Sequence, residues 1–223
     1  MPKLSGPTRV VVESGRRRVF ASALDWPGWT RSAPDEEGAL GALAAYAPRY
    51  HPVAAGAGVA FPARAATAFV VVERVAGSAT TDFGAPGAIA EDEHADLTFS
   101  EAARRAELVR ASWHVLDAVV AGAPAMLRKG PRGGGRDRDA IVDHVLDAEV
   151  AYARKVGLRL RKPDARDAGA VTAFRDEIDA ALRAARSGAS VVPNGWPARY
   201  AARRIAWHIL DHAWEIQDKS PEA

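Results

Sequence analysis

Two histidines four residues apart give the clearest chemical signal in the sequence. His208 and His212 lie in the segment 203–215, RRIAWHILDHAWE, whose apolar residues recur at the spacing of a helix. Residues at i and i+4 share one helix face, and the rest of this face is apolar. Because a buried polar ring without a partner costs about 1–3 kcal/mol, each imidazole must form a hydrogen bond or bind a metal.

This spacing alone has two interpretations. It is equally consistent with two hydrogen-bonded core histidines and with two metal ligands. Ile209, rather than a glutamate, follows the first histidine. The segment therefore does not match the HExxH pattern of zinc proteases.

A third histidine favours the metal. His144 lies between Ile141 and Ala148 in the segment 137–156, at a spacing that predicts an inward-facing ring. Three inward imidazoles without any cysteine suit zinc, nickel, iron or manganese, and they leave positions open for water or substrate, as a catalytic metal requires. Four nearby carboxylates are candidates to orient the rings, and the sequence does not rank them: Asp143, Glu149, Asp211 and Glu215.

The other histidines are expected in solvent. His114 shares a helix face with charged residues, His51 precedes a proline at an expected helix end, and His94 lies in the acidic run EDEHAD. The glycine-rich segment 130–136 lacks the GKS or GKT ending and the preceding strand of a phosphate-binding loop. We therefore interpret it as a turn.

Composition narrows the class of protein. The 223 residues include 30 lysines and arginines against 28 acids, a net charge of +2, and no cysteine. The absence of cysteine excludes disulfides, thiolate metal clusters and a cysteine nucleophile. With no basic arm, no apolar run of about 18 residues and no signal peptide, we expect a cytoplasmic protein without nucleic-acid or membrane partners.

The sequence of the first half of the chain predicts a small α+β unit. Segments 9–13 and 18–24 alternate and are β-branched, which predicts a hairpin that turns at Ser14-Gly15. An acidic helix start at 34–37 precedes apolar residues at helical spacing, and this helix is expected to end before Pro52. The apolar run at 66–75 predicts a buried strand, and the segment 77–96 predicts a linker or an ordered loop.

The second half reads as four amphipathic helices, over 99–126, 137–156, 170–186 and 198–218. The predicted organisation is thus a small α+β domain with its linker at 1–96, followed by an all-α four-helix bundle at 97–223. Trp207 and Trp214 lie beside the histidine pair. We expect them to pack against another helix or a second subunit, which allows a homodimer, and the alternative is that they wall a pocket.

The second half resembles the DinB/YfiT-like superfamily. The resemblance covers roughly 98–218 and rests on a histidine in the second helix, within DAIVDHVLDAE at 139–149, and on WHILDH at 207–212. It implies a four-helix bundle, often dimeric, in which His144, His208 and His212 bind a divalent metal. Several relatives are transferases or isomerases that use mycothiol, bacillithiol or glutathione, so the resemblance does not fix one reaction.

The first half more weakly resembles HicB-type antitoxins. About forty residues carry this resemblance, in LDWPGW at 24–29 and PDEEGAL at 34–40. The DNA-binding element of many such antitoxins is replaced here by the helical half, so repression and toxin neutralisation are not implied. A lid, a docking surface or a dimer interface is the role that remains for this half.

Two functions from different classes follow. The first is a metal-dependent enzyme in which a low-molecular-weight thiol, such as mycothiol, attacks an electrophilic small molecule as an S-transferase or isomerase. The sequence identifies no catalytic residue for it beyond the metal ligands. The alternative is a noncatalytic, stress-related module that keeps a metal and binds another protein through its first half.

Overall fold

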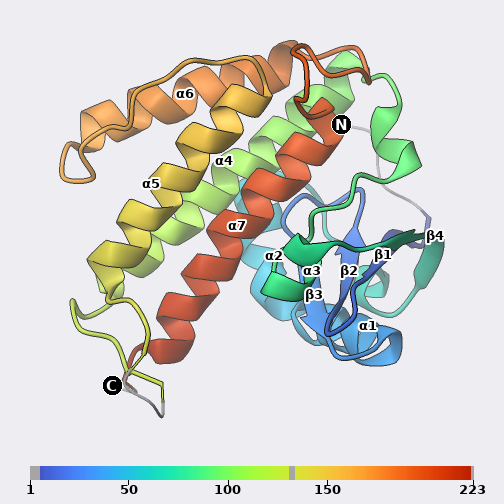
Figure 1. Cartoon of the computed structure of the whole chain (residues 1–223), viewed down its shortest axis with the longest axis horizontal. Coiled ribbons are helices and arrows are strands. Elements are labelled where there is room, and N and C mark those ends of the chain that lie inside the picture. The colour runs from blue at the N-terminus through green and yellow to red at the C-terminus, as the bar shows by residue number, and fades with distance from the viewer. Residues whose placement is uncertain (1–5, 131–133, 222–223) are drawn as a thin grey trace.

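The computed structural model describes residues 6–130 and 134–221, which form an α+β structure (Figure 1). Four strands lie in the first half: β1 Thr8–Ser14, β2 Val19–Ala23, β3 Thr30–Ala33 and β4 Phe69–Ala76. Their helices are α1 Glu36–Ala45, α2 Ala47–Gly56, α3 Ala79–Phe83 and the short turns η1 Ala63–Ala66 and η2 Glu91–His94. Four long helices follow: α4 Phe99–Gly122, α5 Arg138–Lys155, α6 Ala168–Ala184 and α7 Ala198–Lys219. The mixed fold and these four helices were expected from the sequence.

The sheet has the order β3-β2-β1-β4. The predicted hairpin is confirmed, since β1 and β2 pair antiparallel and Ser14 lies opposite Val19. β4 pairs with β1 in parallel, so the chain between them, with α1 and α2, crosses from one end of the sheet to the other.

One prediction for the first half is wrong in detail. β4 is a strand but not a buried one: it lies at the sheet edge and alternates, with Val70 and Val72 45% and 42% exposed. The first helix ends before Pro52 as predicted, at Ala45, but a second helix that the sequence did not indicate, α2, contains Pro52. Only one backbone hydrogen bond is lost there, and the fully buried Tyr50 and Val53 on either side hold the helix against the core.

The sheet is covered on both faces. Val10, Val12 and Ala21 face α1 and α2 in a core that extends onto α4 and α7 through residues such as Leu108 and Leu210. On the opposite face, Phe20 of β2 lies edge-on to Trp207 of α7, with ring centroids 6.1 Å apart. The sheet is therefore packed directly against the last helix (Figure 1).

Gly28 marks a close approach between the two halves. It lies in the turn before β3 with a φ of +92°, and a Cβ there would meet the Leu210 side chain at 2.6 Å and the Ala206 Cβ at 3.1 Å. Both the backbone conformation and the space require glycine. The Trp-Pro-Gly turn at 26–28 thus allows α7 to approach the sheet.

The segment 77–96 is an ordered connection. The buried Glu13 carboxylate of β1 accepts hydrogen bonds from the backbone N–H groups of Gly87 and Ala88, at 2.9 and 3.0 Å. Further along, Glu93 forms a bidentate ion pair with Arg203 of α7, at 2.7 and 2.8 Å. The two side chains are 4% and 2% exposed, so this pair fixes the connection against the last helix.

The four long helices pack around a second apolar core. α4 contacts α6 and α7, and α5 contacts α7, with Ile141, Ile178 and Ile205 fully buried among them. The glycine-rich turn predicted near 130–136 contains residues 131–133, which lie outside the described residues. In the described parts of the chain, no helix combines the length and the apolar composition that crossing a membrane requires. The division of the chain at 96/97 stays a prediction.

We predict that Arg203→Met destabilises the fold by about 3–5 kcal/mol, because it leaves the buried Glu93 carboxylate without its charged partner. Urea denaturation followed by circular dichroism measures this change. Arg74→Ala is the control, since Arg74 pairs with Glu36 at the surface and its loss is expected to have little effect. Equal destabilisation by both variants would show that the buried pair does not hold the two halves together.

Candidate metal centre

His144, His208 and His212 come together between α5 and α7. One ring nitrogen from each lies within 4.8 Å of the others, a group that could hold a metal ion. The ring centroids of His144 lie 5.2 Å from His208 and 5.0 Å from His212, and the two rings of α7 are 4.6 Å apart. The sequence therefore predicted correctly which imidazoles converge.

Burial favours the neutral form of two of these rings. His208 is 7% exposed, and this burial, with the nearby charges of His212 and Arg204, holds its pKa well below the ordinary value. Burial also lowers the pKa of the less buried His144, again with a contribution from His212. Neutral imidazoles are the form that binds metal.

His208 has an unsatisfied atom. Its buried Nδ1 has no hydrogen-bond partner in the structure, although leaving such a group bare costs about 1–3 kcal/mol. The ring also lies within the group of three nitrogens. A metal ion bound there would take up a ring nitrogen for which the protein offers no partner. The residues present therefore fit a divalent metal.

Glu215 orients the third ring. Its Oε2 lies 2.7 Å from Nδ1 of His212, and its other oxygen pairs with Lys219. The bond to His212 is the main cause that lowers the pKa of Glu215 to about 2, with Lys219 acting in the same direction against burial. Because this carboxylate is ionised and only accepts hydrogen bonds, the His212 proton lies on Nδ1 and Nε2 is free to bind a metal.

The other three candidate carboxylates have partners other than the histidines. Asp143 pairs with Lys162 at 2.7 Å, and Asp211 pairs with Arg31 of β3 at 3.1 Å. Glu149 accepts a hydrogen bond of 2.6 Å from the Trp113 indole in the interface of α4 and α5. The structure thus ranks what the sequence left open, in favour of Glu215.

Two neighbours of the histidines were not identified from the sequence. The Tyr152 ring lies 5.6 Å from that of His208, and Arg204 lies one turn before His208 on α7. The spacing of Tyr152 from His144 and of Arg204 from His208 could have indicated both, because i+8 and i−4 positions share a helix face. A tyrosine and an arginine are, however, so common in helices that the spacing has little specificity.

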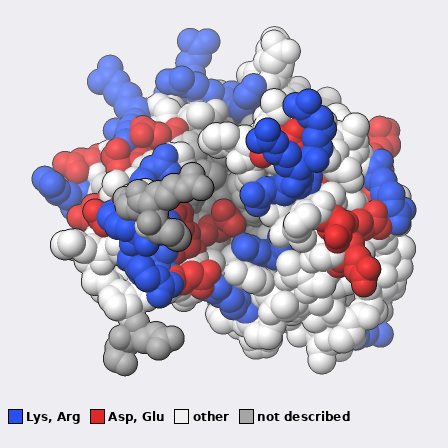
Figure 2. Space-filling view, turned by 60° about the horizontal axis from the view of Figure 1, so that its bottom comes forward, with Lys and Arg blue, Asp and Glu red and all other residues white. Residues whose placement is uncertain are grey.

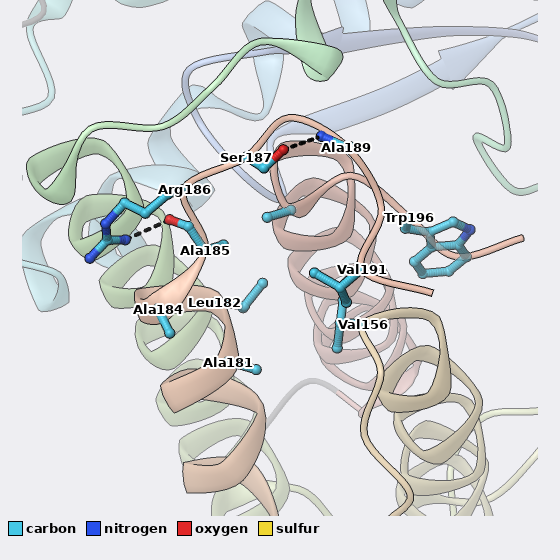
Figure 3. A pocket seen from close by; sticks show the side chains of 11 residues that line it. Val156, Ala181, Leu182, Ala184, Ala185, Arg186, Ser187, Ala189, Val191 and Trp196 are labelled. Carbon is cyan, nitrogen blue, oxygen red and sulfur yellow. Dashed lines mark hydrogen bonds between the residues drawn. The ribbon is translucent and has the colours of Figure 1, made fainter. Parts of the chain in front are cut away.

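An apolar cavity of about 250 Å³ lies at the end of the helices, and none of the three histidines lines it (Figure 3). In Figure 3, Ala181 and Leu182 of α6 lie across from Val156 and Val191. Trp196 also lines the cavity, and its ring is 5.0 Å from that of Tyr152. Aromatic contacts therefore connect the cavity wall to His208.

The tryptophans of α7 pack within the protein and do not line this cavity, but their partners lie in the first half of the chain rather than on another long helix or a second subunit. Trp214 lies against Tyr46, with ring centroids 5.1 Å apart, and Trp207 against Phe20. Both are buried by the first half of the same chain. The predicted exposure of His51, His94 and His114 is confirmed.

Side chains of both charges lie on one face of the protein. Figure 2 shows lysine and arginine side chains interspersed with aspartate and glutamate on the face that it draws.

No protein-family model, curated protein or solved structure matches this chain.

We predict that His144→Ala, His208→Ala and His212→Ala each reduce bound zinc to well below one ion per chain, because each removes one nitrogen ligand. Elemental analysis of protein purified without a nickel column measures the content. His114→Ala, which changes an exposed ring, should retain the wild-type content. The same content in all four variants would refute the assignment of the ligands.

We predict that Glu215→Gln weakens metal binding by about 10–100-fold, because the amide no longer fixes the His212 ring as an ionised acceptor. A competition titration with a chromogenic chelator gives the affinity. Asp143→Asn is the matched control, since this carboxylate pairs with Lys162. An unchanged affinity in Glu215→Gln would mean that Glu215 does not support the site.

Proposed function

We propose that the protein is a metal-dependent enzyme that transfers a low-molecular-weight thiol to, or isomerises, an electrophilic small molecule. The observation that carries the proposal is the convergence of three imidazoles, of which His208 also has a buried Nδ1 without a hydrogen-bond partner. The resemblance to the DinB/YfiT-like superfamily, drawn from the sequence, supports the same reaction class. Zinc, nickel, iron and manganese are all compatible with three nitrogen ligands.

His144, His208 and His212 would hold the ion. A divalent ion bound by three histidines acts as a Lewis acid that favours the thiolate form of a thiol at neutral pH. The nucleophile must come from outside the chain, because the sequence contains no cysteine. Mycothiol, bacillithiol and glutathione are the thiols that the resemblance suggests.

The chain's own residues prepare the site for this chemistry. Glu215 keeps the His212 proton on Nδ1, so the ring presents Nε2 without a change of tautomer. The rings of Tyr152 and Trp207 pack against the His208 ring, with centroids 5.6 and 6.0 Å away. They limit the access of water to it. The apolar cavity beyond Trp196 offers space for an apolar part of the substrate.

One observation favours a noncatalytic alternative. β4 forms an exposed sheet edge with Val70 and Val72 open to solvent, and such an edge can pair with a strand of another protein. In that alternative the metal stabilises the helices, and the first half binds a partner.

We predict that the metal-loaded protein accelerates conjugation of one of these thiols to a chromogenic electrophile such as 1-chloro-2,4-dinitrobenzene. Treatment with a chelator should abolish the activity, and added metal should restore it. His144→Ala should be inactive, whereas His114→Ala should match the wild type. Tight metal binding without turnover of any thiol would favour the noncatalytic alternative.

A further inference from the structure

Arg204 is a buried cation without an anionic partner. It is 8% exposed, and its buried Nη1 has no hydrogen-bond partner. Over residues 6–130 and 134–221, no carboxylate lies within ion-pair distance of its guanidinium. The other buried arginines of these ranges each bind a carboxylate or a backbone carbonyl: Arg104, Arg105, Arg175, Arg199 and Arg203. Because burying an unpaired charge costs several kcal/mol, Arg204 is the exception that needs an explanation.

Aromatic rings hold the guanidinium of Arg204. Its Cζ lies 4.6 Å from the ring centroid of Trp207 and 5.6 Å from that of Tyr152. Stacking on a ring engages the face of a guanidinium and leaves its edge accessible. At this edge Arg204 interacts with the Tyr152 hydroxyl, whereas Nη1 has no hydrogen-bond partner and matches an oxygen of an oxyanion.

The position of Arg204 relates it to the three histidines. It precedes His208 by one turn of α7, and Tyr152 contacts both the guanidinium and the His208 ring. A divalent ion bound by the histidines would repel the positive charge of Arg204, and an anion placed near both would offset this repulsion. A ligand that carries a negative group would relieve this repulsion.

We propose that Arg204 binds the carboxylate of the molecule that occupies the three-histidine site. This inference rests on the proposed function in placing a ligand there, and it assigns that ligand to the carboxylate-bearing small molecules. A carboxylate matches Arg204 in shape and charge, because two coplanar oxygens carry its single negative charge and face the planar guanidinium. Arg204 is thus a binding residue for the thiol or for the electrophile.

The guanidinium itself reports whether this is correct. The Nε–Hε signal of Arg204 in a ¹⁵N-labelled sample is assigned by its loss in Arg204→Lys, and acetate is titrated into zinc-loaded and metal-free protein. We expect a saturable shift of this signal with acetate and none with acetamide, a neutral molecule of similar size. The signal of Arg203, which is buried beside it but paired with Glu93, is the internal control and should not move. An Arg204 signal that does not respond to acetate in either sample overturns the proposal.

A second measurement places the carboxylate on a ligand of the metal site. Absorption titrations of the cobalt-loaded protein compare 3-mercaptopropionate with 2-mercaptoethanol, which lacks the carboxylate. We expect wild-type protein to bind the first about tenfold more tightly, the effect of one charge-assisted hydrogen bond. Arg204→Gln should lose this preference while it retains its affinity for 2-mercaptoethanol, which also shows that the variant is folded.

The outcomes separate the two proposals. A preference that persists in Arg204→Gln overturns the role of Arg204 and leaves the metal-dependent function standing. Protein that binds neither zinc nor cobalt overturns the metal-dependent function, and the acetate titration of the metal-free sample then decides whether Arg204 binds a carboxylate.

Discussion

The burial of α7 is the constraint on which the rest of the structure depends. Every residue from Arg199 to Leu210 is buried, because the sheet packs on one side of the helix and α4 and α5 on the other. Over these residues the helix loses its water, so each polar side chain there must find a partner inside the protein. The first half of the chain is therefore part of what makes the site dry, whatever other role it has.

The polar residues of α7 obey this constraint with two exceptions. Arg199 and Arg203 bind the connection between the halves, and His212 binds Glu215. His208 and Arg204 each keep a buried nitrogen without a partner, and they are one turn apart. Unsatisfied groups that gather at one place in an otherwise satisfied helix indicate a bound ligand more strongly than either group alone.

The sequence predicted the parts of the structure that depend on local periodicity. Apolar spacing identified the four long helices, and the i, i+4 rule placed His144, His208 and His212 on inward faces. Properties that depend on tertiary contacts were beyond it. The edge position of β4 depends on strand order, and α2 forms around Pro52 with Tyr50 buried against the core. Arg204 is distinguished from Arg203 only by its lack of a carboxylate nearby. For the same reason Glu215 could not be ranked above Asp211 before the pairing of Asp211 with Arg31 was known.

X-ray absorption at the zinc edge tests most directly whether the three imidazoles share one cation. The account predicts scattering from three imidazoles, with nitrogen at about 2.0–2.1 Å from zinc, in the wild-type protein. It also predicts two imidazoles in His144→Gln, because α5 supplies only one of the rings. A spectrum with fewer than three imidazoles in the wild type, or one that His144→Gln leaves unchanged, would contradict it.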